Sequence, residues 1–94
     1  MEENGLDNEL LALTEDLQKD MLELYGPMVG DKVLSDLLGY TNLKAFRQAV
    51  FRGVISIPIF TIQNRRGKFA LTKDVATWLA EQRLKNVINK KEEN

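Results

Sequence analysis

The sequence predicts a mainly α-helical domain with a small β-hairpin, an α+β fold built around a single core. Two observations lead to this prediction. Apolar residues recur at intervals of three and four in four separate segments, and a β-branched stretch with alternating isoleucines lies between the third and the fourth. A chain of 94 residues has the length of one small domain.

An amphipathic helix is expected over residues 6–24. Its apolar positions fall in one narrow stripe at about 100° per residue, and they are Leu6, Leu10, Leu13, Leu17, Met21 and Leu24. The opposite face is acidic, and Gly26 and Pro27 end the helix, because proline cannot continue a helical hydrogen-bond ladder. We therefore distinguish an acidic N-terminal helix (1–25), a main domain (26–88) and a polar tail (89–94).

Two short helices separated by a turn with Gly39 are expected next. Asp31 is the predicted N-cap of the first helix, whose buried face would hold Val33, Leu34, Leu37 and Leu38. Thr41 is the predicted N-cap of the second helix, which runs to Arg52 and ends at Gly53. Its inward residues would be Leu43, Phe46, Ala49 and Val50. Two short helices around such a turn are typical of a helix-turn-helix.

A β-hairpin is expected after the second short helix. Its first strand would hold Ile55, Ile57 and Ile59, and Pro58 makes this an edge strand or interrupts it, because proline cannot donate to a ladder. Its second strand would cover residues 68–71, after a polar loop that contains glycine. A hairpin in this position turns the predicted fold into a winged helix-turn-helix, preceded by the extra amphipathic N-terminal helix.

The last helix is expected to begin at Thr72 as N-cap, with Asp74 near its positive end. Its apolar residues form two faces: Val75, Trp78 and Leu79 on one, and Ala76, Ala80, Leu84 and Val87 on the other. A helix with two apolar faces usually has two packing partners. One of them would be the N-terminal helix or a second subunit.

The formal net charge of −1 hides a strong asymmetry along the chain. Residues 1–31 contain nine acidic residues and one lysine, which gives −8, whereas residues 32–91 contain twelve basic and three acidic residues, which gives +9. A basic body behind an acidic N-terminal segment suggests a domain that binds polyanions, with an added segment of different purpose. The alternative is that these charges only solvate the surface.

The composition also argues against several classes of protein. The chain has neither cysteine nor histidine, which removes disulfides, thiolate metal sites and the commonest general base. We find no phosphate-binding loop and no metal-ligand spacing, so we expect no enzyme, no cofactor and no metal. No apolar run approaches the ~20 residues of a membrane span, and we expect a cytoplasmic protein without membrane contact.

The second short helix carries the side chains best suited to reading double-stranded DNA. If its apolar residues point inward, five others share the outward face: Lys44, Arg47, Gln48, Phe51 and Arg52. Arginine and lysine pair with guanine in the major groove, glutamine pairs with adenine, and an apolar group contacts the thymine methyl. The alternative is an ordinary solvated helix with the phenylalanine packed against the hairpin.

The hairpin loop adds Arg65, Arg66 and Lys68 without a nearby acid. A flexible basic loop can contact phosphates or enter the minor groove. The alternative is a charged turn that only prevents edge pairing.

In this order of elements, residues 25–83 resemble the small MerR-like winged-helix proteins of the excisionase and AlpA-type regulator group. The matching segments are LSDLLGY at 34–40, FRQA at 46–49, RG at 52–53, IPI at 57–59, RRGKF at 65–69 and LTKDVATWL at 71–79. The resemblance implies binding to double-stranded DNA without a cofactor. It also implies a role as a transcription regulator or as an excisionase-like recombination factor of a mobile element.

By position, the resemblance implies base contacts from Lys44, Arg47 and Gln48. It implies backbone or minor-groove contacts from the other basic residues, which are Arg52, Arg65, Arg66 and Lys68. The acidic N-terminal helix and the low isoelectric point of about 5.4 depart from the pattern of the group.

A protein-protein interaction adaptor on the same scaffold remains the alternative function. In that hypothesis residues 6–24 form the contact element: they make a homodimer, bind another protein, or fold over the basic surface as a polyanion mimic. The same leucine stripe is equally suited to packing on the core of its own domain.

Overall fold

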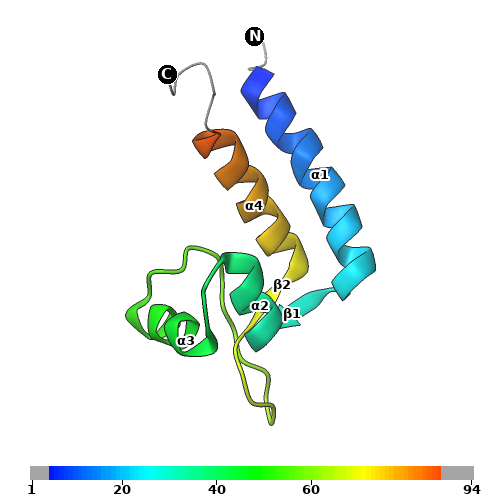
Figure 1. The fold of residues 1–94 in the computed structure, drawn as a ribbon. Coiled ribbons are helices and arrows are strands. Elements are labelled where there is room, and N and C mark those ends of the chain that lie inside the picture. Colours follow the sequence, from blue (N-terminus) through cyan, green and yellow to red (C-terminus); the bar gives the residue numbers. More distant parts are fainter. Residues whose placement is uncertain (1–4, 88–94) are drawn as a thin grey trace.

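The computed structural model describes residues 5–87, and the side chains of residues 8–87. This part of the chain is a mainly helical small domain with four helices and one two-stranded antiparallel sheet (Figure 1). The elements are α1 (Gly5–Tyr25), β1 (Met28–Gly30), α2 (Asp31–Leu38), α3 (Leu43–Arg52), β2 (Phe69–Leu71) and α4 (Thr72–Asn86). None of the described helices is both long enough and apolar enough to cross a membrane.

The first and last helices, α1 and α4, run side by side in opposite directions (Figure 1). Gln18 Nε2 on α1 donates to the carbonyl oxygen of Lys73 and to Thr77 Oγ1 on α4, both at 3.5 Å. Met21 is buried in the core, with Leu17 packed beside it. The N-terminal helix thus packs within its own domain, through one face of α4.

The predicted apolar stripe of α1 is wrong at its C-terminal end. Leu24 is 72% exposed, whereas Tyr25 is half-buried and packs against the core. The chain leaves the helix after Tyr25, and Gly26 adopts a positive φ of 82°, so the tyrosine is the last α1 side chain turned toward the core. The prediction for Leu6 falls outside the described side chains.

The sheet differs from the predicted hairpin. β2 pairs with β1, in the register Met28 to Leu71, Val29 to Ala70 and Gly30 to Phe69. The expected first strand around Ile55–Ile59 does not form, and Pro58 in its middle has no N–H to donate to a ladder on the other edge of β2. A single pair remains, in which Phe60 and Phe69 exchange two backbone hydrogen bonds of 2.8 Å.

Gly30 makes the approach of β1 to β2 possible. A Cβ atom at this position would lie 2.6 Å from the Phe69 ring, which is closer than two carbon atoms can approach. Because Gly30 has no side chain, the Phe69 ring can pack directly against the backbone of β1.

The three predicted N-caps are wrong in position. Asn42, not Thr41, caps α3, since its Oδ1 accepts the Ala45 N–H at 2.8 Å. Thr72 lies inside α4, fully buried, and its Oγ1 donates to the Gly26 carbonyl at 2.6 Å. Asp31 is the first residue of α2 and not its N-cap. Its carboxylate accepts the Lys68 N–H at 2.8 Å and does not cap α2.

The core lies where the four helices and the sheet meet, and α1 contributes Met21 to it. Its fully buried apolar residues are Leu34, Phe46, Ala70, Val75, Ala76 and Ala80. On α2, Leu37 and Leu38 pack against this core as predicted, but Val33 is exposed. On α4, Val87 is likewise exposed, because it lies beyond the last helical turn.

Candidate nucleic-acid interface

The orientation of α3 follows the prediction from its apolar spacing. Phe46 and Ala49 are buried, and Leu43 and Val50 pack against the core. Gly53, with a positive φ of 71°, ends the helix as expected. The residues on the opposite face are all exposed, and they are Lys44, Arg47, Gln48, Phe51 and Arg52.

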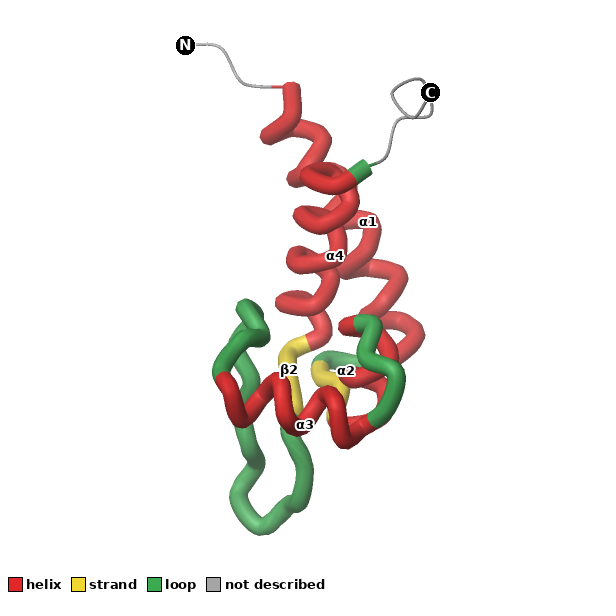
Figure 2. Tube along the Cα trace, turned by 60° about the vertical axis from the view of Figure 1, so that its left-hand side comes forward, coloured by secondary structure: helices red, strands yellow, loops and turns green. Residues whose placement is uncertain are grey.

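The acidic helix α1 does not cover this face. It packs along α4, and α1 and α3 lie on opposite sides of the molecule, with α2 and the sheet between them (Figures 1 and 2). The hypothesis that residues 6–24 fold over the basic surface therefore does not describe this structure. The outward face of α3 is open to solvent.

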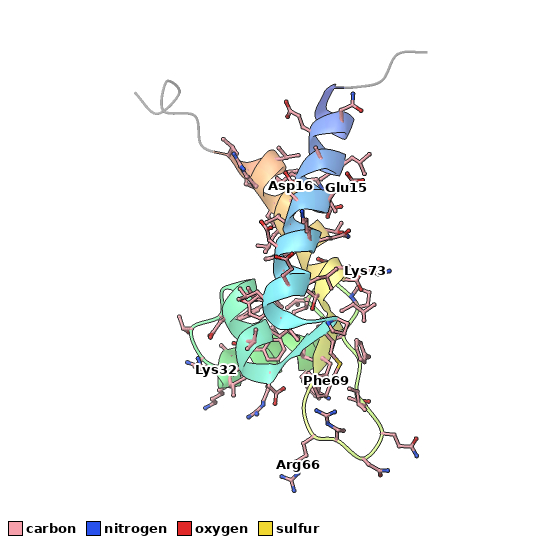
Figure 3. The ribbon with its side chains drawn as sticks, turned by 90° about the vertical axis from the view of Figure 1, so that its right-hand side faces the viewer. Glu15, Asp16, Lys32, Arg66, Phe69 and Lys73 are labelled. Carbon is pink, nitrogen blue, oxygen red and sulfur yellow. The ribbon has the colours of Figure 1, made fainter. Side chains whose placement is uncertain are left out.

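The basic loop, defined here as residues 61–68, extends from the same end of the molecule as α3 (Figure 2). Its base is closed by the Phe60–Phe69 pair, and the Arg65 N–H donates to the Ile62 carbonyl at 2.9 Å. Arg66 is exposed at the loop tip (Figure 3), whereas Lys68 at the base is half-buried. The loop thus has a fixed base and an exposed arginine at its far end.

Arg65 has a different environment from Arg66. Its guanidinium carbon lies 5.6 Å from the centroid of the Phe69 ring, within the range of a cation–π interaction. The Phe69 ring itself packs near that of Phe60, at 6.2 Å between centroids. Arg65 therefore stabilises the base of the basic loop through the ring that it covers.

Asp31 connects α3 with the basic loop. Its Oδ1 accepts the Lys68 N–H at 2.8 Å, and its Oδ2 lies 3.7 Å from Arg47 Nη2. Gly67 has a φ of 108° and passes so close to the carboxylate that a Cβ atom there would lie 2.9 Å from Oδ2. One carboxylate therefore holds both the loop backbone and a side chain of α3.

This role of Asp31 is not apparent from the sequence. Its two partners lie far along the chain, and no local spacing indicates such contacts.

The two predicted groups of basic residues meet in one depression between α3 and the basic loop. It has a volume of about 360 Å³. Its lining residues are Asp31, Arg47, Val50, Phe51, Arg66, Gly67 and Lys68. Lys44, Gln48 and Arg52 border a second, shallow depression on α3, which shares Arg47 and Phe51 with the first. Arg65 borders neither of them.

The basic residues of α3 and the basic loop lie at one end of the molecule, away from the acidic side chains of α1. The last turn of α4 adds Arg83 and Lys85 at the other end, beside the start of α1. Arg66 marks the basic end, and Glu15 and Asp16 on α1 lie toward the other end (Figure 3). The exposed acids of α1 are Glu9, Glu15, Asp16, Asp20 and Glu23. The arrangement is suited to binding a polyanion at the end formed by α3 and the basic loop.

The described residues contain no group of three or more acidic side chains that could hold a metal ion. Comparisons with protein-family models, with curated proteins and with solved structures give no match to this chain.

Proposed function

We propose that this protein binds double-stranded DNA sequence-specifically as a winged helix-turn-helix protein. In this proposal α2 and α3 are the helix-turn-helix, α3 is the recognition helix, and the basic loop is the wing. The protein acts as a transcription regulator or as an excisionase-like recombination factor of a mobile element. The observation that supports this most is the open outward face of α3, with its polar side chains exposed next to the basic loop.

The chemistry of α3 is suited to base recognition. Its ten residues span about 15 Å along the helix axis. With its side chains, an α-helix is about 10–12 Å in diameter, which fits a major groove about 12 Å wide. Lys44 and Arg47 donate to guanine O6 and N7, and Gln48 exchanges two hydrogen bonds with adenine. The ion pair of Arg47 with Asp31 is long and partly exposed, so a base can compete for the guanidinium.

The basic loop supplies contacts that do not depend on sequence. Arg66 at the tip is free to enter the minor groove beside the site or to contact its phosphates. In this proposal Lys68, at the base of the basic loop, and Arg52, at the end of α3, contact the DNA backbone. These charges make affinity fall as salt rises, with a slope of about −0.9 in log K against log salt for each phosphate neutralised.

Selection of bound duplexes from a random DNA pool, followed by affinity measurements on the selected site, tests the proposal. We expect Arg47→Ala to cost about 1–3 kcal/mol and to relax the preference at one base pair. Arg66→Ala should weaken binding to selected and unselected duplexes alike. Lys19→Ala, which removes one positive charge from α1 at the acidic end, should leave affinity unchanged.

Two results would contradict this proposal. One is a protein that enriches no sequence and binds no duplex even at low salt. The other is a site whose affinity neither Arg47→Ala nor Arg66→Ala changes, which would mean that the reading surface lies elsewhere.

The second candidate function is a protein-interaction adaptor with α1 as its contact element. The supporting observation is that Leu11 and Leu22 are 59% and 43% exposed among the acidic residues of α1. Eleven residues apart, they lie on nearly the same helix face. If α1 forms a homodimer, replacing Leu11 and Leu22 together by serine should lower the molecular mass measured by sedimentation equilibrium from that of a dimer toward that of a monomer. Deleting residues 1–25 would not be informative, because it also removes the buried Met21.

A further inference from the structure

Phe51 is the most exposed large apolar side chain of the described residues, with 91% of its surface accessible. It lies on the outward face of α3 and does not pack against the basic loop. A phenylalanine can bury 150–250 Å² of surface, about the most that any side chain offers to a ligand. The ring is therefore free to contact a binding partner.

The charged residues around Phe51 indicate the chemistry of its binding partner. It borders both depressions of the basic end, and the two share only Phe51 and Arg47. The charged side chains that line these depressions with it are cationic except for Asp31. A matching ligand is therefore anionic overall and has a small apolar group within reach of α3.

We propose that Phe51 determines specificity by contacting the C5-methyl group of a thymine in the major groove. The inference rests on the proposed function. The major groove places this methyl group between flanking phosphates, and it is the only apolar group that the edges of the standard base pairs present there. The minor groove presents no methyl group, so the contact also requires α3 to lie in the major groove.

The helix geometry predicts where this thymine lies. Phe51 follows Arg47 by four residues, one turn along the same face, which corresponds to about 6 Å along the helix axis. Successive base pairs are about 3.4 Å apart. The thymine read by Phe51 should therefore lie within about two base pairs of the base read by Arg47.

Uracil scanning of the selected duplex tests the proposal, because deoxyuridine differs from thymidine only by the missing methyl group. We expect uracil at one thymine to weaken binding of the wild-type protein about fourfold, as for one buried methyl group. Uracil at the other thymines should have no effect. Phe51→Ala should bind the thymine and uracil sites equally, and Phe51→Leu should recover part of the discrimination.

A second arm asks whether the methyl group itself is recognised. A cytosine at the sensitive position should bind more weakly than 5-methylcytosine by a similar factor with the wild-type protein, and equally with Phe51→Ala. Leu24→Ala is the matched control, an exposed apolar truncation on α1 that should keep the full uracil effect. Circular dichroism should show unchanged unfolding for the Phe51 variants, because the ring has no packing to lose.

Three outcomes overturn the inference. The first is a site at which no thymine responds to uracil, and the second is a uracil effect that Phe51→Ala retains in full. In both of these the DNA-binding proposal stands and only the role of Phe51 is lost, as it would be if the ring served a protein contact. The third is the absence of any duplex binding, which overturns the proposed function and this inference together.

Discussion

At the scale of single residues, Asp31 connects α3 with the basic loop, and its backbone has an uncommon conformation. Its φ is 33°, in the left-handed region that residues other than glycine rarely adopt, although aspartate tolerates it better than most. This conformation starts α2 immediately after β1 and aims the carboxylate at Lys68 and Arg47. The Asp31 N–H also donates to the Lys68 carbonyl at 3.0 Å, so both the backbone and the side chain of Asp31 hold the basic loop beside α3.

We expect Asp31→Ala to lower the free energy of unfolding by about 1–3 kcal/mol, because the Lys68 N–H would lose its acceptor in a half-buried position. Asp31→Asn keeps an acceptor and should be closer to the wild type in stability. Since the neutral amide no longer pairs with Arg47, the Asn variant should also bind duplex DNA more tightly. Urea unfolding and duplex titration measure the two effects.

Asp36→Asn is the matched control for the stability effect. It removes a carboxylate from the same helix, where the ion pair with Lys32 is largely exposed. Such a pair contributes about 0–1 kcal/mol. Equal stability of Asp31→Ala and Asp36→Asn would show that Asp31 does not hold the loop.

At the scale of elements, the sequence predicted the helices better than the sheet. The predicted range 6–24 and the observed Gly5–Tyr25 agree closely, because helical periodicity is a local property of the chain. The pairing of β1 with β2 joins segments about forty residues apart, and β1 has only three residues. No local pattern signals such a strand, so its pairing was missed and a longer partner was predicted in its place.

The start of α3 allows a direct test of capping. Asn42→Ala should lower the free energy of unfolding by about 1 kcal/mol, because its side chain accepts the Ala45 N–H. Thr41→Ala, one residue earlier, should change it by less than about 0.5 kcal/mol, as is usual for an exposed position. Thermal unfolding followed by circular dichroism compares the two variants. A larger loss of stability for Thr41→Ala than for Asn42→Ala would show that Thr41 is the N-cap.

At the scale of the whole molecule, the candidate site combines predictable and unpredictable parts. The outward residues of α3 follow from the inward spacing of Phe46 and its apolar neighbours, which the sequence displays. The depression shared by Arg47 and Arg66 requires the tertiary fold, since their segments are brought together by Asp31 and the base of the basic loop. Likewise, α4 has two apolar faces in the sequence, but only the structure identifies α1 as the partner of one of them.

The packing of α1 predicts that it is part of the stable domain. Met21→Ala should lower the free energy of unfolding by about 2–5 kcal/mol, because it opens a cavity beneath α1. Leu24→Ala, three residues later on the same helix, should cost less than about 0.5 kcal/mol, because Leu24 is exposed. Chemical denaturation measures both values. Equal, small effects would mean that α1 is detachable and contributes little to the core.

The antiparallel pairing of α1 and α4 brings Gly5 and Asn86 to one pole of the molecule, remote from the basic loop (Figure 1). A surface anchor or a fluorescent group attached at this pole would therefore lie away from α3 and the basic loop. Immobilised through this pole on a sensor chip, the protein would leave α3 and Arg66 accessible to the flowing solution.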